Sequence, residues 1–454
     1  MLTLAGLGGL LLAALGAVWI RSRRAGRWLG VELVPPVRAH YIQAGVQLCI
    51  YAYWGYYWRD VYSAVPLIVS QLFFVYAFEA LVAWSRGRSW RLGCGPLPII
   101  LSTNLFLWFR EDWFFLQFAM IAAAILSKEF LKWTRDGQRV HVFNPSAFAL
   151  CLASVVLLAT GTTELTTGVE IATTLYRPPH IYLEIFLLGL IVQYFFSTTL
   201  MTLSAAGTLV LLNVVYTEVT GVYHFVDANI PAAVFLGFHL LVTDPKTSPR
   251  TGVGKVLFGA LYGLGIWLLY GVLGSLGLPQ FYDKLLPVPI LNLSVRLIDH
   301  VARHGLVAGL SRREATVSPR RLNLLSMGAW TALFVAMLGT GFVEARHAGN
   351  SVAFWMKAFE ERRPGAGEKL LQKLELRALA GSGSAHNVLG TFHLDGRLVR
   401  RDPDAAAVFF ASACELGHLP GCANVVKQWF GTGRARSEAD VARALEHLEA
   451  AAVA

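Results

Sequence analysis

The sequence predicts an all-α protein: a polytopic bundle of about 10–12 transmembrane helices, followed by a soluble domain of helical repeats. Three observations support this prediction. Of the 454 residues, 55% are hydrophobic and only 15% are charged, which is too apolar for an average soluble protein. Apolar runs near the roughly 20 residues that cross a bilayer as a helix recur along the first three-quarters of the chain. From about residue 344, Ala, Gly and charged residues follow an amphipathic period instead.

The first apolar run is expected to be an anchor helix with its N-terminus outside. It has no basic segment before it and ends at Arg21-Ser22-Arg23-Arg24, the reverse of a secretory signal peptide. One of the shorter runs is a candidate re-entrant segment, and the last two have the least certain ends. In chain order, the predicted spans are 2–20, 42–58, 61–84, 97–109, 113–130, 143–161, 181–196, 198–216, 230–242, 256–278, 286–301 and 322–342.

The charges of the loops between the spans predict which side of the membrane each loop faces. Basic blocks at 86–91, 128–139, 246–255 and 303–321 all fall on one side if the spans alternate, whereas the loops 110–112, 162–180 and 217–229 are acidic or nearly neutral. Basic loops stay on the cytoplasmic side, which predicts a bacterial inner membrane protein with its C-terminal domain in the periplasm. These blocks account for the net charge of +10, so the expected partner is the lipid bilayer and not nucleic acid. The predicted layout is an anchor helix and basic loop (1–38), a transmembrane domain (39–305), a basic loop and last transmembrane helix (306–343) and a repeat domain (344–454).

The C-terminal domain contains an internal repeat. The first copy has a segment that ends at Gly396 and is followed by Ala405. The second copy has a similar segment that ends at Gly433 and is followed by Ala442. Both pairs are offset by 37 residues, which is close to the ~34 residues of helix-turn-helix solenoid repeats. We therefore expect pairs of antiparallel helices stacked on one another.

This tail resembles Sel1-like repeats, and residues 413–422 look like the cysteine-bearing variety found in secreted members. In that variety the two cysteines form a disulfide that joins antiparallel helices. The resemblance implies a bond between Cys414 and Cys422, which would persist only in an oxidising compartment, and a protein partner for the repeats. The alternative that both cysteines are small buried hydrophobic residues stays open.

Two short segments that interrupt a helix, called corners here, lie directly beside apolar spans. Phe143-Asn144-Pro145 predicts a helix start, with Asn144 as the cap and Pro145 in the first turn, where it loses no hydrogen bond. Within residues 237–251, Thr243-Asp244-Pro245 is expected to end a helix. Its polar side chains can form hydrogen bonds with the backbone groups that the helix end leaves free, or with a ligand. Both corners fall at the predicted cytoplasmic side, together with Thr247. Simple turn chemistry in a membrane bundle remains the alternative.

These motifs resemble one family of membrane proteins, the NqrB/RnfD-like family. The segments 142–147, 236–249 and 254–263, in this order, look like RnfD of the Rnf electron-transport complex and NqrB of the sodium-pumping NADH:quinone reductase. The resemblance covers roughly residues 39–303 and continues through Asn292 and 296–299. It implies a flavoprotein that relays electrons beside other membrane subunits and is not catalytic alone. The flavin, FMN or riboflavin, would lie near Asn144, Pro145, Thr243, Asp244 and Thr247.

Members of that family also carry FMN attached through its phosphate to a threonine, in a motif Asp-Gly-x-Ser-Gly-Ala-Thr-Pro-Leu of an outer loop. Residues 168–175 keep the spacing of Gly, Ala, Thr and Leu, which makes Thr173 the candidate attachment point. They depart from the motif at Thr167, Glu170, Ile171 and Thr174. A polar loop that simply stays hydrated is the alternative.

Charged residues inside the spans are expensive in lipid and mark functional positions or ion pairs. Glu79 and Glu184 are candidates for ion or proton passage, and Arg296 and Asp299, three residues apart, are expected to pair. Two functions therefore stay open. The first is a flavin-dependent electron-transport subunit with possible coupling to cation movement. The second is a non-redox relative that has lost flavin attachment and displays a periplasmic repeat domain that binds protein.

Overall fold

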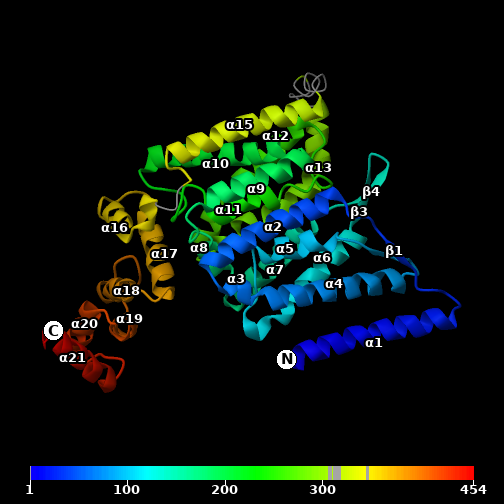
Figure 1. Cartoon of the computed structure of the whole chain (residues 1–454). Helices are drawn as coiled ribbons and strands as arrows, with labels where there is room; N and C mark the ends of the chain where they lie inside the picture. The colour runs from blue at the N-terminus through cyan, green and yellow to red at the C-terminus, as the bar shows by residue number, and fades with distance from the viewer. Residues whose placement is uncertain (1, 305–308, 310–317, 344–346, 454) are drawn as a thin grey trace. The chain divides into compact units, whose positions relative to one another are not determined.

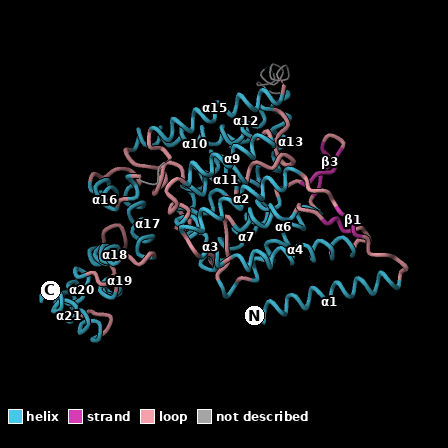
Figure 2. The backbone as a smooth tube through the Cα atoms, viewed as in Figure 1, coloured by secondary structure: helices cyan, strands magenta, loops and turns pink. Residues whose placement is uncertain are grey.

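The computed structural model describes residues 2–304, 309, 318–343 and 347–453 and is predominantly helical (Figures 1 and 2). The chain forms two compact units, each described here by itself. The bundle unit is Met1–Leu212 with Ile230–Ala345, and the tail unit is Asn213–Asn229 with Arg346–Ala454. Most of the predicted basic loop at 306–317, and the predicted start of the tail at 344, lie outside the described residues.

Two small sheets depart from the all-α prediction. β1 (Val31–Leu33) pairs in parallel with β2 (Trp90–Leu92), and β3 (Lys132–Arg135) pairs antiparallel with β4 (Gln138–His141). Both lie in loops between apolar helices, where the backbone groups of the loops need partners. Gly137 at φ 75° and Asp136 at φ 50° form the tight turn of the β3–β4 hairpin.

Among the described residues, five helical segments are long and apolar enough to cross a membrane, which confirms the prediction of membrane helices. Several predicted spans are shorter, and two of them, 97–109 and 230–242, form helices of only nine residues. The five segments are α3 with α4 (Asp60–Ser63, Val65–Ser85), α10 (Thr199–Thr220), α12 (Gly252–Ser275), η3 with α13 (Gln280–Lys284, Pro287–His304) and α15 (Pro319–Gly339). The other helices of the bundle unit are α1 (Leu2–Arg24), α2 (Arg38–Tyr57), α5 (Pro96–Asn104), α6 (Phe115–Phe130), α7 (Pro145–Thr160), α8 (Gly168–Thr174), α9 (Ile181–Phe196) and α11 (Ala232–Leu240).

The bundle unit contains an internal repeat that sequence analysis missed. Two long helices, a nine-residue helix and two further helices occur first as α2, α4, α5, α6 and α7, and again as α9, α10, α11, α12 and α13. The contacts repeat as well: α2 packs on α5 as α9 packs on α11, and α6 packs on α7 as α12 packs on α13. Five crossings per set would place the second set in the opposite orientation, the arrangement of inverted repeats in transporters.

The short helices α5 and α11 leave freed backbone groups inside the bundle, where lipid cannot bond them. Buried side chains do so instead. After α5, Gln117 Nε2 donates to Leu107 O over 2.9 Å, and its Oε1 accepts from Phe109 N over 3.2 Å. At the end of α11, Thr202 donates to Phe238 O over 2.9 Å and Thr243 donates to His239 O over 2.7 Å. The buried polar residues therefore compensate for the broken helices.

Helices α10 and α12 approach one another closely at two glycines one turn apart. An ideal Cβ on Gly259 would lie 2.2 Å from Met201 O, and one on Gly263 would lie 2.6 Å from Ala205 O. Small residues four positions apart let membrane helices approach backbone to backbone. This crossing holds α10 beside α12 in the second set.

We predict that Gly259→Ala destabilises the bundle by about 1–3 kcal/mol, because the added methyl group meets backbone that cannot move aside. Thermal unfolding of the purified protein in detergent measures the effect. Gly207→Ala in α10 is the matched control, since its added Cβ meets nothing within 4 Å. Equal unfolding temperatures for the two variants would refute the proposed close approach.

Ion pairs between the loops of the bundle unit bring the basic loops together at one end, as the charge pattern predicted. At one end, Arg250 pairs with Asp136 at 3.2 Å, Arg135 pairs with Asp299 at 2.6 Å and Arg86 pairs with Glu129 at 3.8 Å, so three of the basic blocks meet there. The other end joins the loops after α5 and α7, where Arg110 pairs with Glu170 at 2.6 Å. We call these the Arg135 end and the Arg110 end.

The tail unit is built of the helices α16 (Val352–Glu360), α17 (Ala366–Leu379), α18 (Gly383–Asp395), α19 (Pro403–Glu415), α20 (Leu419–Thr432) and α21 (Glu438–Val453). The 37-residue repeat corresponds to α18–α19 and α20–α21. Gly396 and Gly433 end α18 and α20 in the left-handed conformation, at φ 72° and 67°. Asn424 Nδ2 donates to Asn387 Oδ1 over 2.8 Å, so equivalent positions of consecutive repeats bond to each other.

The loop after α10 belongs to the tail unit, although the sequence placed it in the transmembrane domain. Val222 and Val226 are buried in one core with Trp355 and Leu370. Lys373 pairs with Asp227, and Arg363 donates to Gly221 O. The tail helices therefore share one core with the segment that follows α10.

Candidate functional site

The first candidate site is the junction of three segments that carry the sequence motifs. Asn144 caps α7: its Oδ1 accepts from Ser146 N over 3.1 Å and from Ala147 N over 3.4 Å. Its Nδ2 donates to Leu241 O, 2.9 Å away, after the end of α11. Its backbone N–H donates to Asn292 Oδ1 in α13 over 3.0 Å. One residue thus ties α7, α11 and α13 together, and Pro145 occupies the first turn of α7 as expected.

The Thr-Asp-Pro corner completes this junction. Asp244 Oδ2 lies 3.0 Å from His141 Nε2, and Asp244 Oδ1 accepts from Lys246 N over 3.0 Å. Burial acts to raise the pKa of Asp244, but His141 and Lys246 outweigh burial and hold the pKa below its ordinary value. Thr247 is buried; its hydroxyl donates to Asp244 O, and its own carbonyl accepts from Asn292 Nδ2. The corner is closed largely by its own side chains.

A buried ion pair reinforces the Arg135 end and corrects one sequence prediction. Asp299 pairs with Arg135 in β3, and its Oδ1 accepts from Arg250 N over 2.9 Å. Arg296 instead donates to Thr134 O over 2.7 Å, and its guanidinium lies 4.5 Å from the ring centroid of Trp133. The predicted pair of Arg296 with Asp299 was wrong, because the β3–β4 hairpin folds over α13 and offers both side chains partners that neighbours in the helix cannot match.

The structure thus brings Asn144, Pro145, Thr243, Asp244 and Thr247 together, but most of their polar atoms already bond to neighbouring residues of the fold. Asn144 is 7% exposed and Thr243 is 1% exposed. The accessible polar edge of the junction is Asp244 with Lys246, beside His141. A ligand at this junction would contact that edge and would not lie between the two corners.

Thr173 lies at the other end of the bundle unit. Asn144 begins α7 and the loop with Thr173 follows its end, so a helix of 16 residues, roughly 24 Å long, separates them. Thr173 is exposed in α8, and its hydroxyl donates to the carbonyls of Val169 and Glu170. The side chain of Glu170, at a position that departs from the family motif, pairs with Arg110. One flavin could not contact both candidate positions.

Gly168, which the motif retains, has a packing role. An ideal Cβ at this position would lie 2.5 Å from Cε1 of Phe281 in η3. A larger residue would therefore push α8 away from the helix break between α12 and α13. The retained glycine consequently does not by itself indicate a flavin site.

The two carboxylates predicted to take part in ion passage, Glu79 and Glu184, lie on different helices. Glu79, towards the end of α4, pairs with Lys128 Nζ at 3.3 Å. Glu184 lies in the first turn of α9, and its Oε2 is buried without a hydrogen-bond partner among the described residues. The two carboxylates share no hydrogen bond or ion pair in the described chain, and their role in ion passage stays a prediction.

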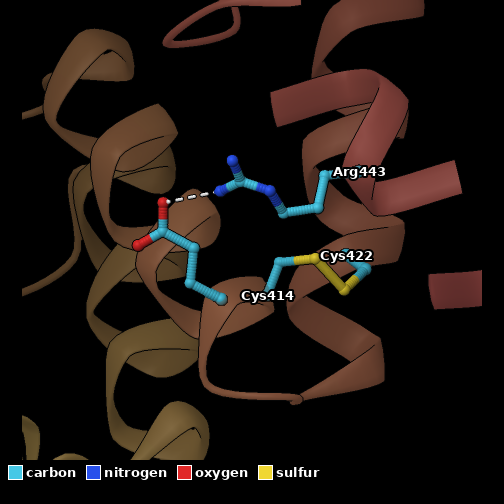
Figure 3. The surroundings of a disulfide bond; sticks show 4 residues. Cys414, Cys422 and Arg443 are labelled. Carbon is cyan, nitrogen blue, oxygen red and sulfur yellow. Dashed lines mark hydrogen bonds and ion pairs between the residues drawn. A yellow bond between two sulfur atoms is a disulfide. The ribbon is translucent and has the colours of Figure 1, made fainter. Parts of the chain in front are cut away.

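The cysteine pair of the tail unit is bonded. Cys414 in α19 and Cys422 in α20 form a disulfide across the turn between these helices, with their Cα atoms 4.6 Å apart (Figure 3). Both residues are buried in the core that α19, α20 and α21 share. Arg443 of α21 reaches over to Glu415, at 3.2 Å. The bond therefore joins two consecutive repeats.

Comparisons with family models, with curated proteins and with solved structures find no match to this chain.

We predict that Asn144→Ala lowers the stability of the bundle by about 2–3 kcal/mol, since it removes a helix cap and leaves Leu241 O without this donor. Asn144→Ser should cost about 1 kcal/mol, because the serine keeps the cap and loses only the amide donor. Denaturant or thermal unfolding in detergent compares the two variants. A smaller loss for alanine than for serine would contradict the double role of Asn144.

Proposed function

We propose that this chain is a membrane subunit of a flavin-dependent electron-transport system, of the NqrB/RnfD-like kind, in the bacterial inner membrane. One observation carries the proposal. Two of the three segments on which the resemblance rests, 142–147 and 236–249, meet in a single hydrogen-bonded junction with Asn292, where the resemblance continues 148 residues after Asn144. Segments that resembled the family by chance would have no reason to meet. Their convergence supports a shared fold and, through it, a shared function.

The geometry favours flavin at one of the two implied positions. The Thr173 hydroxyl is exposed in a short helix beside the Arg110–Glu170 pair, where an attached phosphate would find a nearby cation. Asn144 and Thr243 are buried, and their side chains already donate to Leu241 O and His239 O, so these residues do not fit a flavin ring between them. When bound, the flavin would supply the redox chemistry. The chain would hold it at Thr173 and keep its surroundings fixed.

A second candidate function rests on the tail unit. The disulfide between Cys414 and Cys422 favours an oxidising compartment. The tail shares a unit with residues 217–229, the loop that the charge pattern places outside. In this alternative, a non-redox member displays a periplasmic, Sel1-like binding domain on a membrane anchor.

We predict that the protein purified in detergent shows flavin absorbance, part of which stays with the acid-precipitated chain. Thr173→Val should abolish only that attached fraction, because the phosphate ester needs the hydroxyl. Thr160→Val is a matched control at another exposed threonine near the same end of α7. A colourless, correctly folded preparation would exclude the redox proposal and favour the second function. Attached flavin that persists in Thr173→Val would exclude Thr173.

We predict that a membrane-impermeant thiol reagent labels Cys414 and Cys422 in intact spheroplasts, and only after reduction of their disulfide. The background variant replaces Cys49, Cys94 and Cys151 by serine, since these three cysteines are free thiols. A control variant that keeps only Cys94, beside the basic block 86–91, should be labelled only after lysis. Labelling of the tail cysteines only after lysis would invert the proposed orientation.

A further inference from the structure

A group of arginines at the end of α1 has no part in the proposed function. Arg21, Arg23 and Arg24 lie in the last turn of α1, and Arg27 lies in the turn that follows it. Arg88 lies just after the end of α4. All five side chains are exposed, and we call these residues the arginine patch.

The fold joins the two parts of the arginine patch. Helix α1 packs on α4, and β1 pairs in parallel with β2, so the two helices end on the same side of the bundle unit. Trp84 Nε1 donates to Gly30 O over 3.0 Å, and Trp90 N donates to the same carbonyl over 2.9 Å. An ideal Cβ on Gly87 would lie 3.2 Å from Arg27 Nη1. The turn after α1 is thus hydrogen-bonded to the end of α4, and the arginine patch is one surface.

No carboxylate pairs with the arginine patch in the part of the chain that the structure describes. The acidic side chains of the adjoining segments have other partners. Glu32 pairs with Arg91 at 3.5 Å, and Glu129 pairs with Arg86 at 3.8 Å and with Lys132 at 3.2 Å. Five exposed positive charges on one surface repel one another unless an anion lies among them.

The side chains around the arginine patch place it at the edge of a lipid bilayer. Leu10 and Leu12, earlier in α1, are 70% and 71% exposed, as side chains that face lipid are. The guanidinium carbon of Arg23 lies 5.5 Å from the ring centroid of Trp19 and 5.2 Å from that of Trp28. Both tryptophans are exposed, and tryptophan is enriched at the level of the lipid headgroups. The patch is therefore at the depth of the lipid phosphates.

We propose that the arginine patch binds the phosphate groups of anionic lipids in the leaflet that it faces. A guanidinium group presents several N–H donors in a fixed plane, which matches two oxygens of one phosphate. Clusters of four to eight basic residues beside a membrane helix attract anionic headgroups, and each residue adds roughly a fivefold gain in affinity. Free phosphate would meet the same charges, but only a lipid also has acyl chains to cover the apolar face of α1.

Native mass spectrometry of the full chain in detergent tests this site by lipid titration. The probes are phosphatidylglycerol, which is anionic, and phosphatidylcholine with the same acyl chains, which has no net charge. We expect phosphatidylglycerol to bind more tightly, and its binding to weaken as ammonium acetate raises the ionic strength. The combined variant Arg24→Gln, Arg27→Gln and Arg88→Gln should weaken binding of phosphatidylglycerol about tenfold or more. The same three positions changed to lysine should retain most of the binding, because the charges stay.

A second triple variant controls for the loss of net charge. Arg59→Gln, Arg177→Gln and Arg400→Gln remove three exposed arginines outside the patch and should leave lipid binding unchanged. A further arm adds inorganic phosphate at constant ionic strength, which should not displace the lipid. Equal binding of the two lipids by the unmodified chain, equal losses in the two glutamine variants, or displacement by inorganic phosphate would each overturn the proposal. No readout involves flavin, so the proposed function is tested separately.

Discussion

Backbone groups freed inside a membrane bundle have to be bonded by the protein itself, and the rest of this structure depends on that constraint. Helices α5 and α11 stop after nine residues within the bundle unit, and each break is matched by buried polar side chains. Gln117 serves the segment after α5, while Thr202, Thr243 and Asn144 serve the end of α11. Because lipid offers no replacement for these bonds, each of these polar residues is fixed in place by a particular carbonyl or amide.

The same constraint explains why the motif residues lie together. Asn144 closes a gap between three helices, and Asp244 closes the turn that follows α11 with His141 and Lys246. As a result, the polar side chains of the junction at the Arg135 end are hydrogen-bonded within the protein. At the Arg110 end, by contrast, the Thr173 hydroxyl is exposed. This difference matters for flavin binding, because a binding site needs polar groups that are not already hydrogen-bonded within the protein.

Sequence analysis found the corners, the tail repeat and the basic loops that meet at one end of the bundle unit, because each has a local signal: a proline after a polar cap, a 37-residue spacing, or a basic block. It expected Arg296 to pair with Asp299, but Arg135 bonds Asp299 from a position 164 residues away in the sequence. It also missed the internal repeat, which lies in the order and the contacts of the helices.

By itself, the sequence determined that this is a helical protein with membrane-spanning segments and a repeated helical tail, since hydrophobicity and periodicity are properties of neighbouring residues. Only the tertiary structure decided which polar groups are used up and which are left without partners. That depends on the approach of segments far apart in the chain. Asn144 and Asp244 therefore hold the junction closed, whereas the arginine patch is exposed as one surface because α1 packs on α4.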